Sequence, residues 1–420
     1  MVLSSTVLVI IVIGLLIFIH ELGHLVAAKK LKIPVEKFSI GFGPALIQKK
    51  IGETTYCISL IPLGGYIKLY GEEEEIEGGF ILQPLRKKLL VVLTGPFSNF
   101  ILGLVVIFIT YYSFGIKYTE PRIDLEKSLP ADFPLKRGDL IVRVAGETIP
   151  SFDKLEDKLE KNRGREVKVE FLRQESLFTL SLLSDTLLSA IHPLIKPIVE
   201  RVKKGSPAEK AGLRPMDEII AIDDEEITTW EEFTGIVRKA GGKELKITWR
   251  RGEEVLSAKI RPQTVSDEMG EKQIGQIGLW VYLPKKMPSF LTSLRIAGER
   301  SIYVCVQTVV ILYKVIVGQI SRKAIGGPVM IAKLTYEGVA WGWEYILSLL
   351  AALSLNLFII NLLPIPVVDG GRSLIFIFEK IRKRRLSKKE MERVFFIGYA
   401  LVILIALFAL FNDLRRLVRF

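Results

Sequence analysis

Four long apolar stretches constrain this sequence more than any other feature. They cover residues 1–28, 86–114, 344–378 and 393–415, and each is long enough to cross the hydrocarbon core of a bilayer as a helix. The mean hydropathy is +0.34, yet 25% of the residues are charged. This mixture excludes a uniformly soluble protein and a bare helical bundle. It predicts membrane spans combined with folded parts outside the membrane.

Two segments allow more than one interpretation. Residues 1–28 are apolar enough for a signal peptide, but no charged region precedes them and no small-residue cleavage site is clear, so we expect a retained span. The segment 302–320 is interrupted by Gln307, Lys314 and Gln319. We expect it to form an amphipathic helix, within an exported linker over 267–343, that lies at the membrane interface or packs on protein.

The positions of Lys and Arg predict the orientation of the spans. Basic residues gather in the connection 29–85 and in the loop 379–392, and such clusters stay on the cytoplasmic side of a membrane. Residues 115–343 are then expected on the exported side, although three arginines in the last six residues weaken the assignment for the C-terminus. The net charge of +12 fits basic residues beside anionic headgroups, and no pattern typical of nucleic-acid binding occurs.

The first span ends in an H-E-x-x-H pattern, His20-Glu21-Leu22-Gly23-His24. On a helix, residues four apart share a face, so both histidines can bind one Zn²⁺. Glu21 lies beside the first histidine, where it can accept a proton from a water that the metal activates. Ionisable groups at membrane depth usually mark function. The pattern therefore predicts a catalytic metal centre inside an apolar segment.

A catalytic zinc site usually has three protein ligands and an open position. The remaining histidine, His192, falls in the exported region and is a poor candidate. Asp369 is a better one, because it follows two prolines and precedes two glycines within an apolar segment. Such residues interrupt a helix, and irregular backbone at membrane depth is tolerated where it lines a cavity. A carboxylate there needs a cation, and zinc bound by His20 and His24 supplies one.

The region between the second and third spans contains an internal repeat. Similar runs follow Asp139 and Asp217 at a constant offset of 78 residues, which indicates two copies of one module at 115–191 and 192–266. Each copy resembles a PDZ domain, which binds an extended chain end as an added strand. Met216 departs from the glycine that usually precedes the aspartate. Two structural β domains with closed grooves remain an alternative.

Taken together, these motifs resemble the site-2 protease family of intramembrane zinc metalloproteases, in its bacterial type with tandem PDZ domains. The resemblance covers nearly the whole chain and rests on H-E-x-x-H and on N-x-x-P-x-P-x-x-D-G at residues 361–370. It implies that His20, His24 and Asp369 are the ligands of one zinc ion per chain and that Glu21 is the catalytic base.

The resemblance also implies residues that contact substrate. Asparagines of the family's proline motif hold the substrate near the zinc, and the second span carries the family's G-P-x-x-N pattern, for which ordinary helix packing is an equal expectation. Residues 37–69 resemble the family's membrane-associated β-hairpin, whose open edge pairs with unwound substrate. The acidic run 72–75 is expected to be solvated. The expected substrate-binding residues are Asn356, Asn361, Pro364, Pro366, Gly41, Gly43 and Asn99.

We therefore expect a multi-domain membrane protein with an α-helical transmembrane core of about four spans. Two small, mostly β PDZ-like exported domains and a membrane-associated β-hairpin region complete the fold. By the resemblance, the protein lies in the bacterial cytoplasmic (inner) membrane, with its active site near the cytoplasmic side. The resemblance also implies that it cleaves single-span membrane proteins already trimmed on the exported side, such as anti-sigma factors or remnant signal peptides, and that the PDZ domains gate their access.

Two alternative functions remain at this point. A PDZ-bearing, chaperone-like membrane scaffold would keep a metal site without catalysis, and Glu21 argues against it because a scaffold has no use for a general base. A membrane metalloprotease that cuts loops of multi-span proteins would complete its site with a downstream glutamate. The motif at 361–370 argues against this second alternative.

Overall fold

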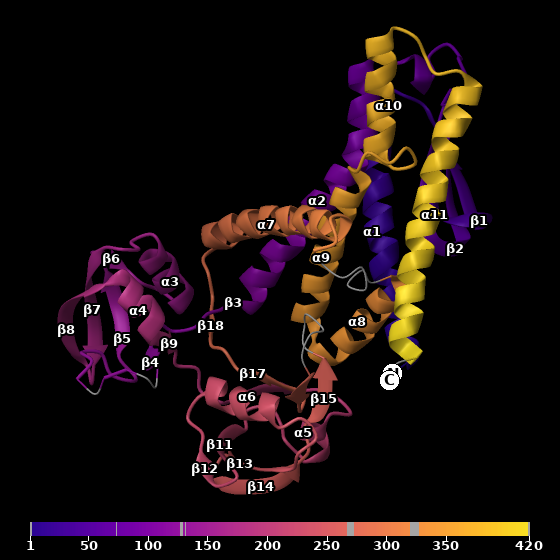
Figure 1. Ribbon diagram of the computed structural model, residues 1–420. Helices are drawn as coiled ribbons and strands as arrows, with labels where there is room; N and C mark the ends of the chain where they lie inside the picture. Colours follow the sequence, from indigo (N-terminus) through magenta and orange to yellow (C-terminus); the bar gives the residue numbers. More distant parts are fainter. Residues whose placement is uncertain are drawn as a thin grey trace. The chain divides into compact units, whose positions relative to one another are not determined.

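The computed structural model describes residues 2–72, 74–126, 129–130, 132–266, 273–319 and 327–418. The chain divides into two compact units (Figure 1). Residues 1–115 together with 287–420 form the first, which we call the helical unit. Residues 116–286 form the second, which we call the repeat unit.

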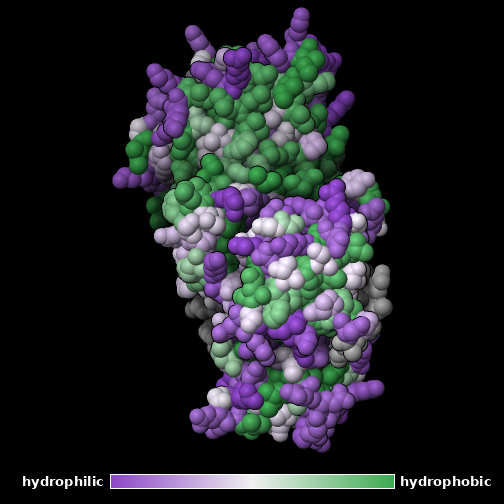
Figure 2. All heavy atoms as spheres, turned by 90° about the vertical axis from the view of Figure 1, so that its left-hand side faces the viewer, coloured by the Kyte–Doolittle hydropathy of each residue, from purple (hydrophilic) through white to green (hydrophobic). Residues whose placement is uncertain are grey.

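Long helices dominate the helical unit because most of its sequence is apolar. Figure 2 shows hydrophobic side chains over a broad part of this unit, with hydrophilic ones gathered at the end where α10 joins α11. By length and composition, five described helices can cross a membrane, namely α1, α2, α7, α9 and α11. The helices are α1 (Val2–Lys30), α2 (Leu85–Phe114), α7 (Phe290–Ile316), α8 (Pro328–Trp341), α9 (Trp343–Asn361), α10 (Asp369–Arg382) and α11 (Lys388–Val418), with a 3-10 turn, η1, at Phe80–Leu82.

The helix α7 contains most of the segment in which an amphipathic helix is expected. It runs crosswise to α1 and α11 (Figure 1) and packs against α2 and α9. Large apolar side chains such as Leu291 and Ile302 stay exposed on it. Residues 267–272 and 320–326 of the expected linker lie outside the described residues. Small side chains recur every fourth position on its packed face, at Ser293, Ala297, Ser301 and Cys305.

Glycines bring α1, α2 and α9 into close contact. A Cβ at Gly103 of α2 would lie 2.7 Å from Cγ of Leu355 on α9, and a Cβ at Gly23 of α1 would overlap the side chain of Ser98 on α2. Small residues of this kind allow the backbones of membrane helices to approach each other. The helix α2 is therefore held against α1, which carries both histidines of the candidate site, and against α9, which carries Asn361.

The strands β1 (Val35–Ile51) and β2 (Thr54–Leu69) form a two-stranded sheet between α1 and α2 in the chain. Both strands are long and irregular, and residues 37–40 have partners in two separate parts of β2. Gly41 and Gly43 lie at the irregular part of β1 with φ of 92° and 84°, a region that favours glycine. The register pairs 37–40 with 65–68 and with 55–58, and pairs 45–51 with 54–59.

The repeat unit contains two sheets of equal strand order, β6-β5-β7-β8 and β12-β11-β13-β14. The first is built from β5 (Leu140–Val144), β6 (Glu147–Thr148), β7 (Glu166–Arg173) and β8 (Ser176–Leu183), with α3 (Phe152–Glu160) and α4 (Ser184–Ala190). The second is built from β11 (Glu218–Ile222), β12 (Glu225–Glu226), β13 (Leu245–Arg251) and β14 (Glu254–Ile260), with α5 (Pro207–Lys210) and α6 (Trp230–Lys239).

Shorter strand pairs complete the repeat unit. We expected the second module to end at residue 266. The pair of β10 with β17 shows that the module continues further, and Ile277 is also buried in its core. The alternation of apolar and polar residues along a strand does not indicate that a later segment of the chain pairs with an earlier strand of the module. The pairs are β3 (Ile116–Lys117) with β18 (Lys285–Lys286), β4 (Ile123–Leu125) with β9 (Ile191–Pro193), β10 (Val199–Val202) with β17 (Leu279–Val281), and β15 (Gln263–Ser266) with β16 (Gln273–Gln276).

An identical buried ion pair occurs in both modules. Arg173 donates to Asp139 from Nε and Nη2 at 2.8 and 2.7 Å, and Arg251 donates to Asp217 in the same way at the same distances. Both carboxylates are 1% exposed. Each pair repeats with the 78-residue offset of the sequence, so the repeat is a duplication of three-dimensional structure as well as of pattern.

Met216 offers a test of backbone strain in the second module. It has φ of 71° where Gly138, 78 positions earlier, has φ of 91°, and its side chain is 62% exposed. A side chain in the left-handed region costs roughly 1–2 kcal/mol, so Met216→Gly should raise the free energy of unfolding by about 1 kcal/mol. Urea unfolding of the full chain, followed by tryptophan fluorescence, measures this change. A lower unfolding midpoint would contradict the expectation, and Gly138→Ala serves as the reverse control.

Candidate metal centre

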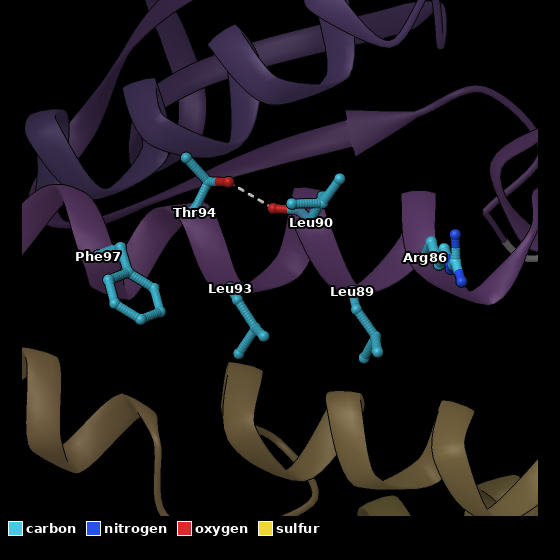
Figure 3. Close-up of a pocket in the computed structure, with 6 residues that line it drawn as sticks. All are labelled: Arg86, Leu89, Leu90, Leu93, Thr94 and Phe97. Carbon is cyan, nitrogen blue, oxygen red and sulfur yellow. Dashed lines mark hydrogen bonds between the residues drawn. The ribbon is translucent and has the colours of Figure 1, made fainter.

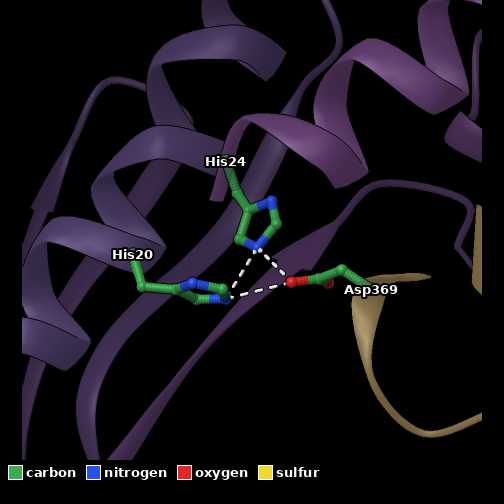
Figure 4. A group of neighbouring side chains, drawn as sticks. All are labelled: His20, His24 and Asp369. Carbon is green, nitrogen blue, oxygen red and sulfur yellow. Dashed lines mark hydrogen bonds and ion pairs between the residues drawn. The ribbon is translucent and has the colours of Figure 1, made fainter. Parts of the chain in front are cut away.

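The two histidines of H-E-x-x-H lie one turn apart on α1 and point toward the same place (Figure 4). Nε2 of His20 lies 3.2 Å from Nε2 of His24. Asp369, far away in the sequence, points to the same place, with Oδ2 at 3.1 Å from Nε2 of His20 and 3.5 Å from Nε2 of His24. The structure thus brings together all three residues expected as metal ligands.

His24 is held from both sides by α2. Its Nδ1 lies 2.8 Å from the backbone oxygen of Val91 and donates to it, which leaves Nε2 without a proton and free to bind a metal. A Cβ at Gly95 would overlap the His24 ring, so only glycine fits there. The side chain of His24 is buried. Val91 was not expected at the site from the sequence, and Gly95 was expected only as the glycine of the G-P-x-x-N pattern that permits close helix contact.

Asp369 reaches the site because the third apolar stretch is broken. The helix α9 ends at Asn361 and α10 begins at Asp369, with Pro364 and Pro366 between them. A Cβ at Gly371 would overlap the backbone of Ile365 and lie 2.7 Å from Cα of Pro366, so this connection packs directly on the first turn of α10. The break thereby aims a buried carboxylate at the two histidines.

The spacing of the three ligand atoms fits a tetrahedral zinc ion. Ligands about 2.0–2.1 Å from zinc in tetrahedral geometry lie about 3.3 Å from one another. The measured separations are 3.1, 3.2 and 3.5 Å, and no other group of three such side chains occurs in the described part of the chain. Two neutral imidazoles and one carboxylate form the donor set of a catalytic zinc site, with a fourth position left for water.

Residues 8–405 match the family profile described as peptidase family M50. The chain belongs to peptidase family M50. This membership confirms the resemblance to site-2 proteases and the assignment as a zinc metalloprotease. The regulator of sigma-E protease RseP of Escherichia coli is 30% identical over 97% of this chain and 98% of its own length. The zinc metalloprotease RasP of Geobacillus kaustophilus is 31% identical over 99% of this chain and 98% of its own length.

One solved structure is similar to a part of this M50 peptidase. It is the PDZ domain of an SdrC-like protein from Listeria monocytogenes, which is 27% identical over 20% of this chain and 84% of its own, with a TM-score of 0.18. The duplicated architecture of the repeat unit rests instead on its repeated sheets and ion pairs.

Glu21, the expected base of this M50 peptidase, faces the β1–β2 sheet. A Cβ at Gly65 would lie 2.9 Å from Cγ of Glu21 and 3.0 Å from Cγ2 of Ile17. Glycine within a strand permits such a close approach. The last part of β2 therefore passes directly beside the residue expected to move protons, which is a position the sequence did not indicate for Gly65.

The expected substrate-binding residues fall into separate groups. Nδ2 of Asn99 and Nδ2 of Asn361 lie 3.2 and 3.5 Å from Nδ1 of His20, beside the metal ligands. Asn356 instead accepts a hydrogen bond of 2.7 Å from Thr308 on α7. Pro364 and Pro366 form the connection before Asp369, and Gly41 and Gly43 shape β1.

We expected the acidic run after β2 to be solvated, and Glu74 and Glu75 are exposed, but Glu72 is half-buried, and Glu72 and Glu75 pair with the segment that follows Asp369. Glu72 pairs with Arg372, which lies one turn after Asp369 on α10, and Glu75 pairs with Arg385. Glu72 also accepts a hydrogen bond from the backbone of Leu69 at 3.2 Å. These partners lie about 300 residues apart, and no local pattern announces them. The Glu72 pair connects the segment directly after β2 to α10, the helix that carries the expected third metal ligand.

A groove of about 600 Å³ follows one face of α2. In Figure 3 its side chains Leu89, Leu93 and Phe97 point toward the helices drawn in gold, and Arg86 lies at one end. None of the three metal-site residues lines this groove, so it is distinct from the metal centre. Its lining residues are Arg86, Leu89, Leu90, Leu93, Thr94 and Phe97.

Proposed function

We propose that this M50 peptidase hydrolyses peptide bonds of single-span membrane proteins within the membrane or at its edge. The observation that carries this proposal is the convergence of His20, His24 and Asp369 at zinc-like spacing, with the histidines on a helix apolar enough to span a bilayer. We also propose that one zinc ion binds per chain.

The residues around the metal centre have distinct roles in this reaction. Zinc, when bound, supplies a Lewis acid that polarises the scissile carbonyl and lowers the pKa of the attacking water. Glu21 takes the proton of that water and passes it to the amine that leaves. His24 is fixed by Val91, and Asp369 by the connection before α10, so the ligands are ordered before substrate arrives.

The β1–β2 sheet supports a role in substrate binding. A helical substrate hides its peptide bonds, so it must be extended before water can attack, and a strand edge stabilises extended chain by backbone hydrogen bonds. Gly65 brings such a strand beside Glu21. We place Asn361 at the bound substrate, because its amide lies near His20.

The E. coli relative is named a regulator of sigma-E protease. On that likeness we extend the proposal to a bacterial inner-membrane protein that cleaves anti-sigma factors or remnant signal peptides after trimming on the exported side. The repeat unit then lies on the exported side and gates access, and the metal centre lies near the cytoplasmic side. The Lys and Arg clusters at 29–85 and 379–392 support this orientation.

Removal of metal tests the proposal directly. We expect the purified full-length protein to cleave a single-span substrate in detergent, to lose at least about 100-fold in rate after treatment with a zinc chelator, and to recover when zinc is returned. Metal analysis should find one zinc per chain. Cleavage that persists in the metal-free protein would contradict the proposal. Zinc binding without cleavage of any single-span substrate would favour the scaffold alternative.

A further inference from the structure

Two side-chain amides converge on the far side of the His20 ring from the metal centre. Nε2 of His20 faces Asp369 and His24, while Nδ1 lies 3.2 Å from Nδ2 of Asn99 and 3.5 Å from Nδ2 of Asn361. Asn99 is fully buried in α2, and its Oδ1 is a buried atom with no hydrogen-bond partner. A buried carbonyl oxygen without a hydrogen-bond donor lowers the stability of the folded state, so a donor is expected beside this atom.

The chemistry of a metal-bound histidine supplies that donor. When Nε2 of a neutral imidazole binds a metal, Nδ1 carries the proton and must donate it. An amide nitrogen cannot accept this proton, but a half-turn of the Asn99 amide exchanges its nitrogen and oxygen. The exchange places Oδ1 of Asn99 at hydrogen-bond distance from Nδ1 of His20, so Oδ1 and the Nδ1 proton become partners, and the amide nitrogen takes the former position of Oδ1.

The backbone of Asn99 is itself anchored. Its carbonyl oxygen accepts a hydrogen bond of 2.7 Å from Ser354 on α9, and the Ser354 side chain is fully buried. Close contact between Gly103 and Leu355 holds the same two helices together. The amide therefore occupies a fixed place beside His20, as an orienting group requires.

We propose that Asn99 is a positioning residue whose side-chain oxygen accepts the Nδ1 proton of His20 and thereby keeps Nε2 free for the metal. This inference rests on the metal centre of the proposed function and replaces a substrate contact for Asn99. It also leaves the amide of Asn361 available to the substrate, because one acceptor is enough for one proton. His24 has the equivalent partner in the backbone oxygen of Val91.

Zinc affinity of the full-length protein tests the proposal, measured by competition with a chromophoric chelator. Asn99→Leu removes the acceptor and should weaken zinc binding by about 10–100-fold, whereas Asn99→Asp keeps an acceptor oxygen and should stay within about threefold of the wild type. Thr110→Val is the matched control, because Thr110 is a buried polar residue of the same helix whose hydroxyl donates to the backbone oxygen of Val106, one turn earlier in α2. Its zinc affinity should not change.

Histidine ¹⁵N NMR provides a second measurement, and its first part leaves Asn99 unchanged. The chain has three histidines, and His192→Gln leaves only the two ligands. In the zinc-loaded protein we expect a hydrogen-bonded Nδ1 proton on each remaining ring, and Asn99→Leu should alter the signal of His20 alone.

Several outcomes would overturn the inference. One is that folded Asn99→Leu binds zinc as tightly as the wild type does. Another is that folded Asn99→Asp and Asn99→Leu bind zinc equally weakly, which would mean that the amide hydrogens of Asn99 are needed. If Asn99→Leu does not fold, the inference would be overturned by the absence of an Nδ1 proton on His20 in the zinc-loaded protein with Asn99 unchanged. Absence of zinc from the wild type would overturn the proposed function as well.

Discussion

Replacing Glu21 by glutamine should reduce the rate of peptide-bond cleavage by about 10²–10⁴-fold while zinc stays bound. Glutamine has nearly the same shape as glutamate, so it fits beside Gly65 and His20 without disturbing the ligands. It cannot take a proton from water at neutral pH. Paired measurements of cleavage of a single-span substrate and of zinc content, on the same protein preparation, check both halves of this expectation.

The design separates loss of chemistry from loss of structure. Equal cleavage by wild type and Glu21→Gln would remove Glu21 from the mechanism. Loss of cleavage together with loss of zinc would instead assign Glu21 a structural part in the metal centre. A change at Glu379, a buried acidic residue of α10 that accepts a bond from the backbone of Leu386, is a suitable control. Glu379→Gln should leave zinc content unchanged.

Replacing Asp369 by alanine should lower zinc affinity by more than about 100-fold, a larger loss than that expected for a residue that only orients a ligand. The change removes one of three ligands and the single negative charge among them, so the two histidines would hold zinc with water in two positions. Chelator competition measures the affinity, and cleavage should fall with zinc occupancy. Unchanged affinity would show that a different group completes the site.

The effect of Asp369→Ala also depends on how the fold positions the carboxylate at the site. Because Asp369 opens α10 next to the packed connection with Pro364 and Pro366, alanine removes the carboxylate and leaves the helix start intact. Excess zinc should therefore restore part of the activity of Asp369→Ala. It should not restore that of Glu21→Gln, and this contrast distinguishes a ligand from a base.

The metal centre could be predicted from the sequence to the extent that its parts follow local rules. Helical spacing places His20 and His24 on one face of a helix. Prolines and glycines predict the helix break that lets Asp369 reach the site. The contacts that hold these ligands follow no local rule. Val91 contributes a backbone oxygen, which any residue type can provide, and Gly95 matters only because α1 packs closely on α2.

The same distinction applies to the rest of the fold. A constant offset predicts the duplication in the repeat unit, because each copy repeats its own local pattern. The ion pairs of Glu72 and Glu75 join residues about 300 positions apart. No local pattern identifies these basic partners, so an acidic run alone predicts solvated side chains. For α7, length and composition are compatible with a span, while its crosswise direction emerges only from packing with α2 and α9.

The ligands of the metal centre come from opposite ends of the chain, and this separation has a consequence for synthesis. His20 and His24 leave the ribosome first, and Asp369 follows about 345 residues later, which takes tens of seconds at roughly 5–20 residues per second. Until then the histidines lack their third ligand. With the proposed ligand set, we therefore expect the nascent enzyme to stay inactive during its own insertion, and a prematurely terminated chain to lack protease activity.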